Sequence, residues 1–302
     1  MLPIENYHLS LFLALGSTLS FSTSSLVFAE YSRRISALWM NCFKCVVAFA
    51  FLAFTIPITT GWHTPSLPSV AGLVLSGFIG LNIGDLFLLN AFARLGAART
   101  LMVFGFQPLF LGIAASLFFS QKFEPRSLIA VIFLIACLVT FALERFRQER
   151  VWGLSGLLFA LVGVSLDASG VLLSRAAFEH SPHLPPLEGN FYRCFGALLG
   201  FALISCFQPI RLFEGYKQLT TIRARALVIA ASFAGTYLAL LLYLTAIKIG
   251  HLASISGIGI TGPIFSAALE CAIYRRAPSP YLIAAFLFFA GGFYILFTAT
   301  AA

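Results

Sequence analysis

Long apolar runs, separated by short charged or proline-containing breaks, constrain this chain more than any other feature. A run of about 18 or more apolar residues is long enough to cross the hydrocarbon core as a helix. Backbone groups in lipid must be satisfied within the segment or in a closed barrel. The runs are continuous rather than alternating, so the pattern excludes the barrel and predicts helices. The breaks define ten expected spans, at 8–29, 35–57, 67–92, 97–120, 127–143, 152–177, 188–207, 225–247, 252–274 and 280–298.

Composition and charge support the same class and exclude others. The chain is 60% apolar and 10% charged, whereas soluble proteins average about 45–50% and about 25%. The net charge of +8 does not indicate a nucleic-acid partner, because the basic residues stand one or two at a time beside apolar runs and predict topological anchors. Cys42 and Cys45 have C-x-x-C spacing without a second pair, so we expect neither a metal nor a cofactor. The first run lacks the basic region of a cleaved signal peptide and is expected to be a retained span.

The two halves of the chain repeat each other. The sequence NCFKC at 41–45 recurs as NFYRC at 190–194, a shift of 149 residues that also aligns Lys44 with Arg193. A shift of 154–155 aligns Arg94 with Lys248, Gly96 with Gly250 and Pro108 with Pro263. Two tandem five-helix domains, 1–146 and 147–302, are therefore expected. An odd number of spans sets the second copy upside down relative to the first, and inverted repeats with a site near the midplane are typical of secondary transporters.

Positive charge predicts the orientation. The connections after the odd-numbered spans hold Arg33, Arg34, Arg94, Arg99, Arg145, Arg147, Arg150, Arg211, Lys217, Arg223, Arg225, Arg275 and Arg276. The other side holds Lys122, Arg126, Arg175 and Lys248. The richer side is expected to be cytoplasmic, which puts both termini outside.

Two corresponding segments carry a family resemblance. The segment 235–265 and its counterpart 83–110 each contain a Gly-containing span, a small-plus-basic end at Ala93-Arg94 or Ile247-Lys248, and a following span with a mid-helix proline. Together with the basic residues of spans 2 and 7, they resemble the EamA-type domain of the drug/metabolite transporter superfamily, in two tandem copies. The resemblance implies a membrane transporter. The chain departs from the family at 120–121 and 275–276, where it has Ser-Gln and Arg-Arg instead of a Gly-Glu pair. Ten-span members of the family usually have cytoplasmic termini, so the resemblance implies the orientation opposite to the one that the charge count predicts.

Charged residues inside the expected spans are the candidates for a substrate pathway. A charge at the centre of a membrane helix costs about 2.5–3.5 kcal/mol on insertion scales, so such residues normally face a cavity or a partner. They are Asp85, Asp167, Glu270, Lys44 and Arg193. One interpretation is a polar pathway between the halves, with a carboxylate that takes up a proton. The other is that Lys44 and Arg193 form ion pairs that fix the packing, and that Glu270 reaches the interface by snorkelling.

Further candidates are polar residues and prolines near these charges. Asn82 lies one helical turn before Asp85 and would share its face, and Gln107 precedes Pro108. Pro108 and Pro263 each remove a helical hydrogen bond and are candidate hinges. The eight hydroxyls of the first span either line a wet path or allow close helix packing. The pattern GxGxxG at 257–262 lies inside an apolar span without a preceding strand, so it does not indicate a dinucleotide site.

The sequence thus predicts a secondary transporter, working as an exporter or exchanger, that moves a small organic metabolite across the inner (cytoplasmic) membrane by alternating access. Proton or counter-substrate coupling and a monomer or homodimer are expected. No Walker A sequence is present. The alternatives are a lipid-handling protein or membrane enzyme, for which no catalytic motif is present, and a passive channel.

Overall fold

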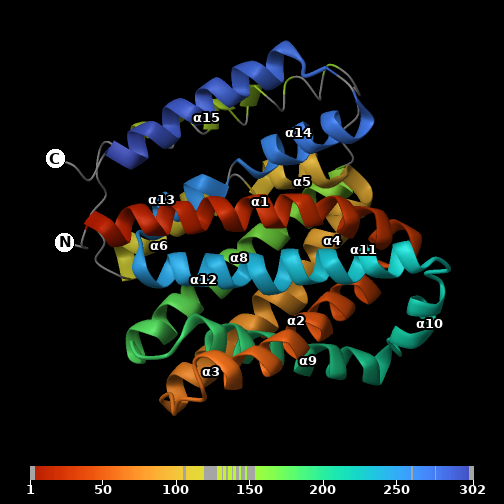
Figure 1. Ribbon diagram of the computed structural model, residues 1–302. Coiled ribbons are helices and arrows are strands. Elements are labelled where there is room, and N and C mark those ends of the chain that lie inside the picture. Colours follow the sequence, from red (N-terminus) through yellow and green to blue (C-terminus); the bar gives the residue numbers. More distant parts are fainter. Residues whose placement is uncertain are drawn as a thin grey trace.

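The structure is a computed structural model that describes residues 4–104, 107–118, 128–130, 132–133, 135–137, 139–140, 143, 147, 154–259, 261–275 and 277–298. Within these residues every regular element is a helix, which confirms the all-helical class (Figure 1). The helices of the first half are α1 (Ile4–Arg34), α2 (Ala37–Thr59), α3 (Leu67–Ser76), the π-helix η1 (Gly77–Gly84), α4 (Asp85–Leu95), α5 (Ala97–Phe104) and α6 (Gln107–Phe118). Those of the second half are α8 (Leu154–His180), α9 (Pro186–Phe207), α10 (Leu212–Lys217), α11 (Ile222–Ser232), the π-helix η2 (Phe233–Leu238), α12 (Ala239–Ile249), α13 (Leu252–Gly259), α14 (Gly262–Tyr274) and α15 (Pro280–Thr298).

Within the described residues, six continuous helices are long and apolar enough to cross a membrane, at Asn6–Arg34, Ala37–Thr59, Leu67–Leu95, Ser155–His180, Pro186–Phe207 and Ile222–Ile249. They coincide with the first, second, third, sixth, seventh and eighth expected spans. The fourth span contains α5 and α6, the ninth contains α13 and α14, and α15 occupies the tenth. The fifth, at 127–143, lies largely outside the described residues. The count of ten spans therefore stays a prediction.

Local sequence determines where several helices begin. The Ser36 hydroxyl accepts a hydrogen bond from the Trp39 amide at 3.0 Å, and the Thr221 hydroxyl accepts one from the Ala224 amide at 3.1 Å. Both are N-caps, which satisfy amides that have no partner inside the helix. Pro186 opens α9, where its missing N–H costs no helical hydrogen bond. Caps and prolines thus convert the breaks in the apolar pattern into helix ends.

The two halves pack on each other reciprocally. In the first half, α1 packs on η2, α12 and α14 of the second half, while α8 of the second half packs on α3, η1 and α4 of the first. Similarly, α2 packs on η2 and α9 packs on η1. The fourth and ninth spans run in opposite directions where they meet, because α5 packs on α14 and α6 packs on α13. Equivalent helices therefore exchange roles across the interface between the halves.

Glycines allow the backbones to approach closely at this interface. A Cβ at Gly77 would lie 1.8 Å from the Arg193 carbonyl oxygen, and a Cβ at Gly196 would lie 2.0 Å from the Val74 carbonyl oxygen. A Cβ at Gly200 would lie 2.6 Å from the Asn82 side chain. Small residues serve helix contact in lipid in this way. The small-xxx-small spacing at 196–200 is therefore a packing seam between α9 and the span that contains η1.

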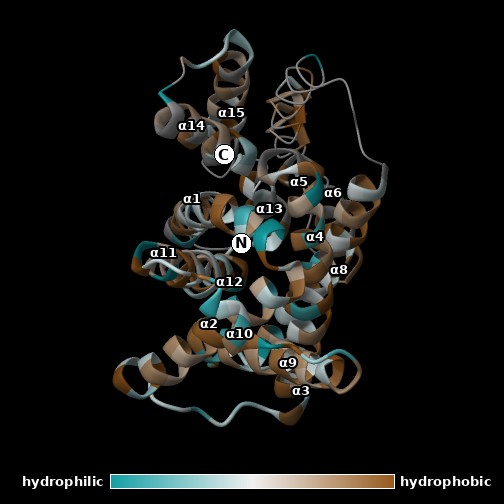
Figure 2. Ribbon diagram, turned by 90° about the vertical axis from the view of Figure 1, so that its right-hand side faces the viewer, coloured by the Kyte–Doolittle hydropathy of each residue, from teal (hydrophilic) through white to brown (hydrophobic). Residues whose placement is uncertain are grey.

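Large apolar side chains cover the outside of the bundle. Leu67, Leu203 and Phe207 are 81%, 59% and 92% exposed. Figure 2, which looks along the helices, shows mostly apolar residues on the outward turns of α3 and α9. Such exposure is unfavourable in water but normal against lipid tails. Together with the six long apolar helices, this surface identifies a multi-pass membrane protein.

Candidate functional site

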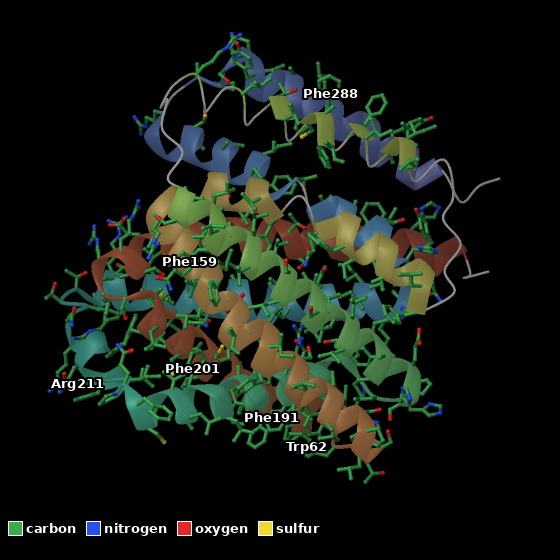
Figure 3. The ribbon with its side chains drawn as sticks, turned by 180° about the vertical axis from the view of Figure 1, so that it is seen from behind. Trp62, Phe159, Phe191, Phe201, Arg211 and Phe288 are labelled. Atoms are coloured by element: carbon green, nitrogen blue, oxygen red, sulfur yellow. The ribbon has the colours of Figure 1, made fainter. Side chains whose placement is uncertain are left out.

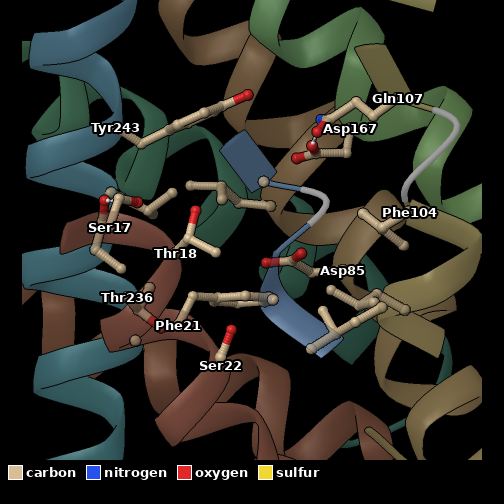
Figure 4. A pocket seen from close by; sticks show the side chains of 18 of the residues that line it. Ser17, Thr18, Phe21, Ser22, Asp85, Phe104, Gln107, Asp167, Thr236 and Tyr243 are labelled. Carbon is tan, nitrogen blue, oxygen red and sulfur yellow. Dashed lines mark hydrogen bonds between the residues drawn. The ribbon is translucent and has the colours of Figure 1, made fainter. Parts of the chain in front are cut away.

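A cavity of about 120 Å³ lies at the centre of the bundle, where helices of both halves meet (Figure 4). The first half contributes the lining residues Ser17, Thr18, Phe21, Ser22, Lys44, Leu81, Asp85, Leu88, Leu101, Phe104 and Gln107. The second half contributes Asp167, Gly235, Thr236, Ala239, Leu240, Tyr243, Gly259 and Gly262.

A buried ion pair forms one side of the cavity. Lys44 in α2 lies 2.6 Å (Nζ to Oδ2) from Asp85, the first residue of α4. The Lys44 side chain is 2% exposed and that of Asp85 is 10% exposed. The ammonium also lies 5.4 Å from the centre of the Phe28 ring, which favours its charge. Lys44 thus neutralises Asp85 while the carboxylate still faces the cavity.

A second carboxylate, Asp167 in α8, faces the same cavity without such a partner. The Gln107 amide nitrogen donates a hydrogen bond to Asp167 Oδ2 at 2.5 Å. Among the described residues, Asp167 forms no ion pair. Figure 4 shows Gln107 and Asp167 side by side, with the Tyr243 hydroxyl pointing toward them from α12. Its hydrogen-bond partner is neutral and it has no direct ion pair, so this carboxylate can still receive a proton or a cationic group.

Arg193 in α9 is buried behind this wall, outside the cavity lining, with unused hydrogen-bonding capacity. It is 1% exposed, and its Nε and Nη1 atoms have no hydrogen-bond partner among the described residues. A Cβ at Gly80 would lie 3.6 Å from Arg193 Nη2 and 3.9 Å from Asp167 Oδ1. The guanidinium and the carboxylate therefore flank the same glycine, but they do not form a direct ion pair.

The repeat-related residues Asn41 and Asn190 differ as Lys44 and Arg193 do: among the described residues, the residue of the first half has more hydrogen-bond partners than that of the second. Asn41 donates from Nδ2 to the Leu81 and Asn82 carbonyls, at 3.1 and 3.0 Å, and so supports the π-helix η1. Asn190, its counterpart in α9, has no hydrogen-bond partner for either side-chain atom within the part of the chain that the structure describes. In the first half the Asn41 amide nitrogen and Lys44 both have partners, although Asn41 Oδ1 has none among the described residues, while in the second half Asn190 lacks partners for both side-chain atoms and Arg193 for Nε and Nη1.

Hydroxyl groups line the opposite wall. Ser17 donates to the Ala239 carbonyl at 2.7 Å, and Thr18 donates to the Ala14 carbonyl one turn back at 2.9 Å. The hydroxyls of Thr236 and Tyr243 have no hydrogen-bond partner among the described residues. Both residues line the cavity, but their hydroxyl oxygens are themselves buried, so a bound molecule would reach them only after a local movement. Neither residue stands out in the sequence, because a single hydroxyl in an apolar span is not distinctive.

The structure places the candidate residues from the sequence in different roles. Lys44, Asp85, Asp167 and Gln107 come together at the cavity. Asn82 does not line it, because its amide donates to the Ala197 carbonyl in α9 at 3.3 Å. In an α-helix Asn82 would share a face with Asp85. The π-helical turns of η1 place Asn82 on a different face.

The remaining candidates lie in the fourth, ninth and first expected spans. Pro263 is in the first turn of α14, directly after the interruption that follows α13. Pro108 occupies the corresponding place in α6, but its side chain and that of Glu270 lie outside the described residues. Of the hydroxyls of the first span, Ser17, Thr18 and Ser22 line the cavity. Gly259 and Gly262 also line it. Among the described residues, no group of His, Cys, Asp and Glu side chains is arranged to hold a metal ion.

Comparisons with known proteins follow the same division of the chain. The model of the EamA-like transporter family matches residues 8–143 and again residues 154–298. A comparison with curated proteins gave no match. One solved crystal structure is similar over 98% of this chain and 97% of its own, with a TM-score of 0.76 and 16% sequence identity. That likeness concerns the fold alone.

Proposed function

The chain belongs to the EamA-like transporter family, in two tandem copies, and from this premise we propose that it is a secondary transporter of a small organic metabolite. It works by alternating access across the cell (inner) membrane, as an exporter or exchanger. The observation that carries the proposal is the central cavity, which both halves line and which holds two carboxylates and one ammonium group. Charged groups inside a membrane domain are costly unless they serve a pathway or a partner.

Alternating access needs two halves that can exchange roles, and the helix directions support such an arrangement. The beginning of α2 contacts the connection that follows α9, through Trp39 and Leu212. The connection that follows α2 contacts the beginning of α9, through His63 and Glu188. The equivalent helices α2 and α9 therefore run antiparallel, as expected for two inverted five-span copies, 1–146 and 147–302. In other carriers with inverted repeats, one repeat rocks against the other around a fixed site.

The ninth expected span supplies a movable part. In it α13 ends at Gly259 and α14 begins at Gly262, with Thr261 in a turn before α14 and Pro263 in its first turn. Discontinuous helices leave backbone groups free to face a substrate. Pro108 and Pro263 are the proposed bending points, and α6 and α14, which contain them, pack on helices of the opposite half. A substrate larger than the cavity of about 120 Å³ requires these segments to move apart.

Asp167 is the proposed coupling residue, because its carboxylate faces the cavity and its hydrogen-bond partner among the described residues is the neutral Gln107. A proton or a basic nitrogen of the substrate would compensate its charge. Basic residues support one orientation: Arg33 and Arg34 end α1, and Arg211 and Lys217 flank α10 at the same end of the bundle (Figure 1). We assign this end to the cytoplasm. A monomer or a homodimer would satisfy the mechanism.

The test is counterflow in proteoliposomes. Purified protein is reconstituted and loaded in turn with a panel of labelled metabolites, with and without a pH gradient. Saturable counterflow of one compound is expected, and an effect of the gradient is expected if Asp167 takes up a proton. Absence of counterflow across a broad panel, with protein shown to be folded, would contradict the proposal and favour a lipid-handling or enzymatic role.

A further inference from the structure

Two connections between helices occupy equivalent places in the two halves. Residues 60–66 join α2 to α3, and residues 208–221, which include α10, join α9 to α11. In Figure 1 the α10 connection lies at the right end of the bundle and the α2–α3 connection at the left end. Figure 3 shows the same separation, with Arg211 at one end and Trp62 toward the other.

The α2–α3 connection is held by a buried carboxylate. The His63 amide donates to both Glu188 oxygens, at 3.1 and 3.2 Å, and His63 Nδ1 lies 2.5 Å from Oε1. The Glu188 side chain is 0% exposed, whereas the His63 side chain is 42% exposed. Next to this pair, Trp62 packs edge-on against Phe191 of α9, with 4.9 Å between ring centres. His63 is therefore the accessible half of a contact whose other half is fixed inside the bundle.

The α10 connection is held by a buried indole. Trp39 lies near the beginning of α2, and its Nε1 donates to the Leu212 carbonyl at 3.0 Å. Gly215 packs directly against this indole, because a Cβ there would lie 2.2 Å from Nε1. Phe43 stacks between Trp39 and Tyr216, at 4.9 and 5.9 Å between ring centres. The whole of α10 therefore rests on the beginning of α2.

These two contacts are the same pair of positions, once in each half. The shift of 149 residues that aligns Lys44 with Arg193 also places position 39 on position 188 and position 63 on position 212. Trp39–Leu212 and Glu188–His63 are thus repeat-related contacts at opposite ends of the bundle. Their chemistry has diverged: one is an indole bonded to a backbone carbonyl, and the other is a carboxylate bonded to an amide and an imidazole.

Each connection also joins the two packing groups that would have to move. The helix α2 packs on α1 and η2 and meets the other group at α9, whereas α3, at the other end of residues 60–66, packs on α8 and α9. In the same way, α9 packs on α3 and η1 and meets the other group at α2, whereas α11 packs on α1, α2 and η2. A rocking motion of one group against the other therefore bends both connections. A contact that fixes a connection to the opposite group limits the motion at that end.

We propose that Glu188–His63 and Trp39–Leu212 are the two end clamps of the transport cycle, and that releasing one of them opens the cavity at its own end only. The inference rests on the proposed alternating access. A hydrogen bond to a charged group is roughly twice as strong as a neutral one. The α10 end, closed by the neutral Trp39–Leu212 bond, therefore opens more readily in the substrate-free protein than the end closed by Glu188–His63.

The experiment measures from which side the cavity can be reached. A reporter cysteine replaces Ser17, which lines the cavity, in a chain where Cys206 and Cys271 are replaced by serine; the structure shows Cys42, Cys45, Cys137 and Cys194 buried. A membrane-impermeant maleimide is applied to right-side-out and inside-out vesicles. A second reporter, at the 70% exposed Phe213, identifies the side on which α10 lies.

Each clamp has two variants, and one control serves both. His63→Ala removes the imidazole from the first clamp and Glu188→Gln removes its carboxylate, so both weaken it although the backbone amide of residue 63 can still donate to residue 188. Labelling from the side opposite to α10 should become on the order of tenfold faster, which corresponds to about 1.4 kcal/mol. Trp39→Phe and Gly215→Ala release the second, and labelling from the α10 side should rise by roughly threefold, as fits a neutral hydrogen bond. His183→Ala removes an exposed histidine from the neighbouring connection and should change neither rate.

The outcomes separate this proposal from the proposed function. If the variants of both clamps change labelling from the same side, or change neither side while counterflow persists, the clamps are refuted and the carrier stands. If each pair of variants raises labelling from its own side but no metabolite shows counterflow, the clamps stand and transport is refuted. Because each clamp has two variants, a misfolded Glu188→Gln or Gly215→Ala protein still leaves His63→Ala and Trp39→Phe as tests.

Discussion

Removing one member of the Lys44–Asp85 pair should cost far more stability than removing both. The two side chains are 2% and 10% exposed and lie 2.6 Å apart, so either single substitution leaves a buried group without its partner. Such a loss typically costs about 3–5 kcal/mol. Lys44→Met leaves Asp85 facing the cavity, where water can reach it. Asp85→Asn leaves the more deeply buried ammonium, although the new amide oxygen can still accept its hydrogen bond. Both effects place the single variants near the lower limit, at about 3 kcal/mol.

The double variant Lys44→Met/Asp85→Asn has no buried charge to compensate. Replacing a buried pair by uncharged residues is often neutral, so the double variant should regain most of the roughly 6 kcal/mol to which two separate losses would add, a coupling of about 5 kcal/mol between the two sites. Reversible unfolding in mixed micelles gives the free energies of all four proteins, and counterflow gives their transport. We expect the double variant to be folded but inactive, because Asp85 lines the cavity.

Two results would refute this reasoning. Additive losses in the double variant would show that the pair contributes no coupling and that the 2.6 Å contact does not determine stability. Full counterflow by a stable double variant would show that the pair serves packing alone and that the cavity does not need the Asp85 carboxylate.

Three further predictions concern the wall around Asp167 and the helix crossings. Gly80→Ala should fold normally, because a Cβ there has only ordinary contacts at 3.6–3.9 Å. It would, however, place a methyl group between Arg193 and Asp167, so counterflow should fall several-fold while thermal stability in detergent is unchanged; unchanged counterflow would contradict this. Asp167→Asn should keep counterflow but abolish its response to a pH gradient, since an amide takes up no proton in this range, and a persisting response would exclude Asp167 as the coupling residue. Gly196→Ala should prevent folding, because its Cβ would lie 2.0 Å from the Val74 carbonyl oxygen; a monodisperse, thermally stable variant would show that the crossing of α9 and α3 can widen.

The sequence was sufficient for features that depend on local composition. Apolar runs and prolines predicted the six long helices, since the cost of unsatisfied backbone in lipid leaves few alternatives. Repetition of NCFKC as NFYRC predicted the two copies that the family model matches. Charge inside a span led to Lys44, Asp85 and Asp167, because an intramembrane charge has to face a partner or a cavity.

Features that depend on contacts between distant residues were not predictable. The π-helix η1 changes the face of Asn82, and it is supported by Asn41, which lies 41 residues away in the chain. The burial of Glu188 depends on the connection that carries His63, 125 residues earlier. Neither relation leaves a periodic signal in the sequence. The repeat could have indicated the second one, because position 188 aligns with Trp39, but a carboxylate and an indole do not resemble each other.

Divergence between the two copies also explains how a symmetric architecture acquires a polarised cavity. Under the shift of 149 residues Asp167 aligns with Thr18, and under the shift of 155 Asp85 aligns with Leu240 and Gln107 with Gly262. All six residues line the cavity. Asp167, Asp85 and Gln107 thus correspond to a hydroxyl, an aliphatic side chain and a glycine in the other copy, whereas Lys44 corresponds to Arg193, which does not line the cavity. Identical copies would offer a substrate the same surroundings in two opposite orientations, and its binding would not distinguish them. With the carboxylates on one wall, a molecule that has one polar end would bind in a single orientation, and under the proposed alternating access that end would remain beside Asp167 whichever end of the bundle is open.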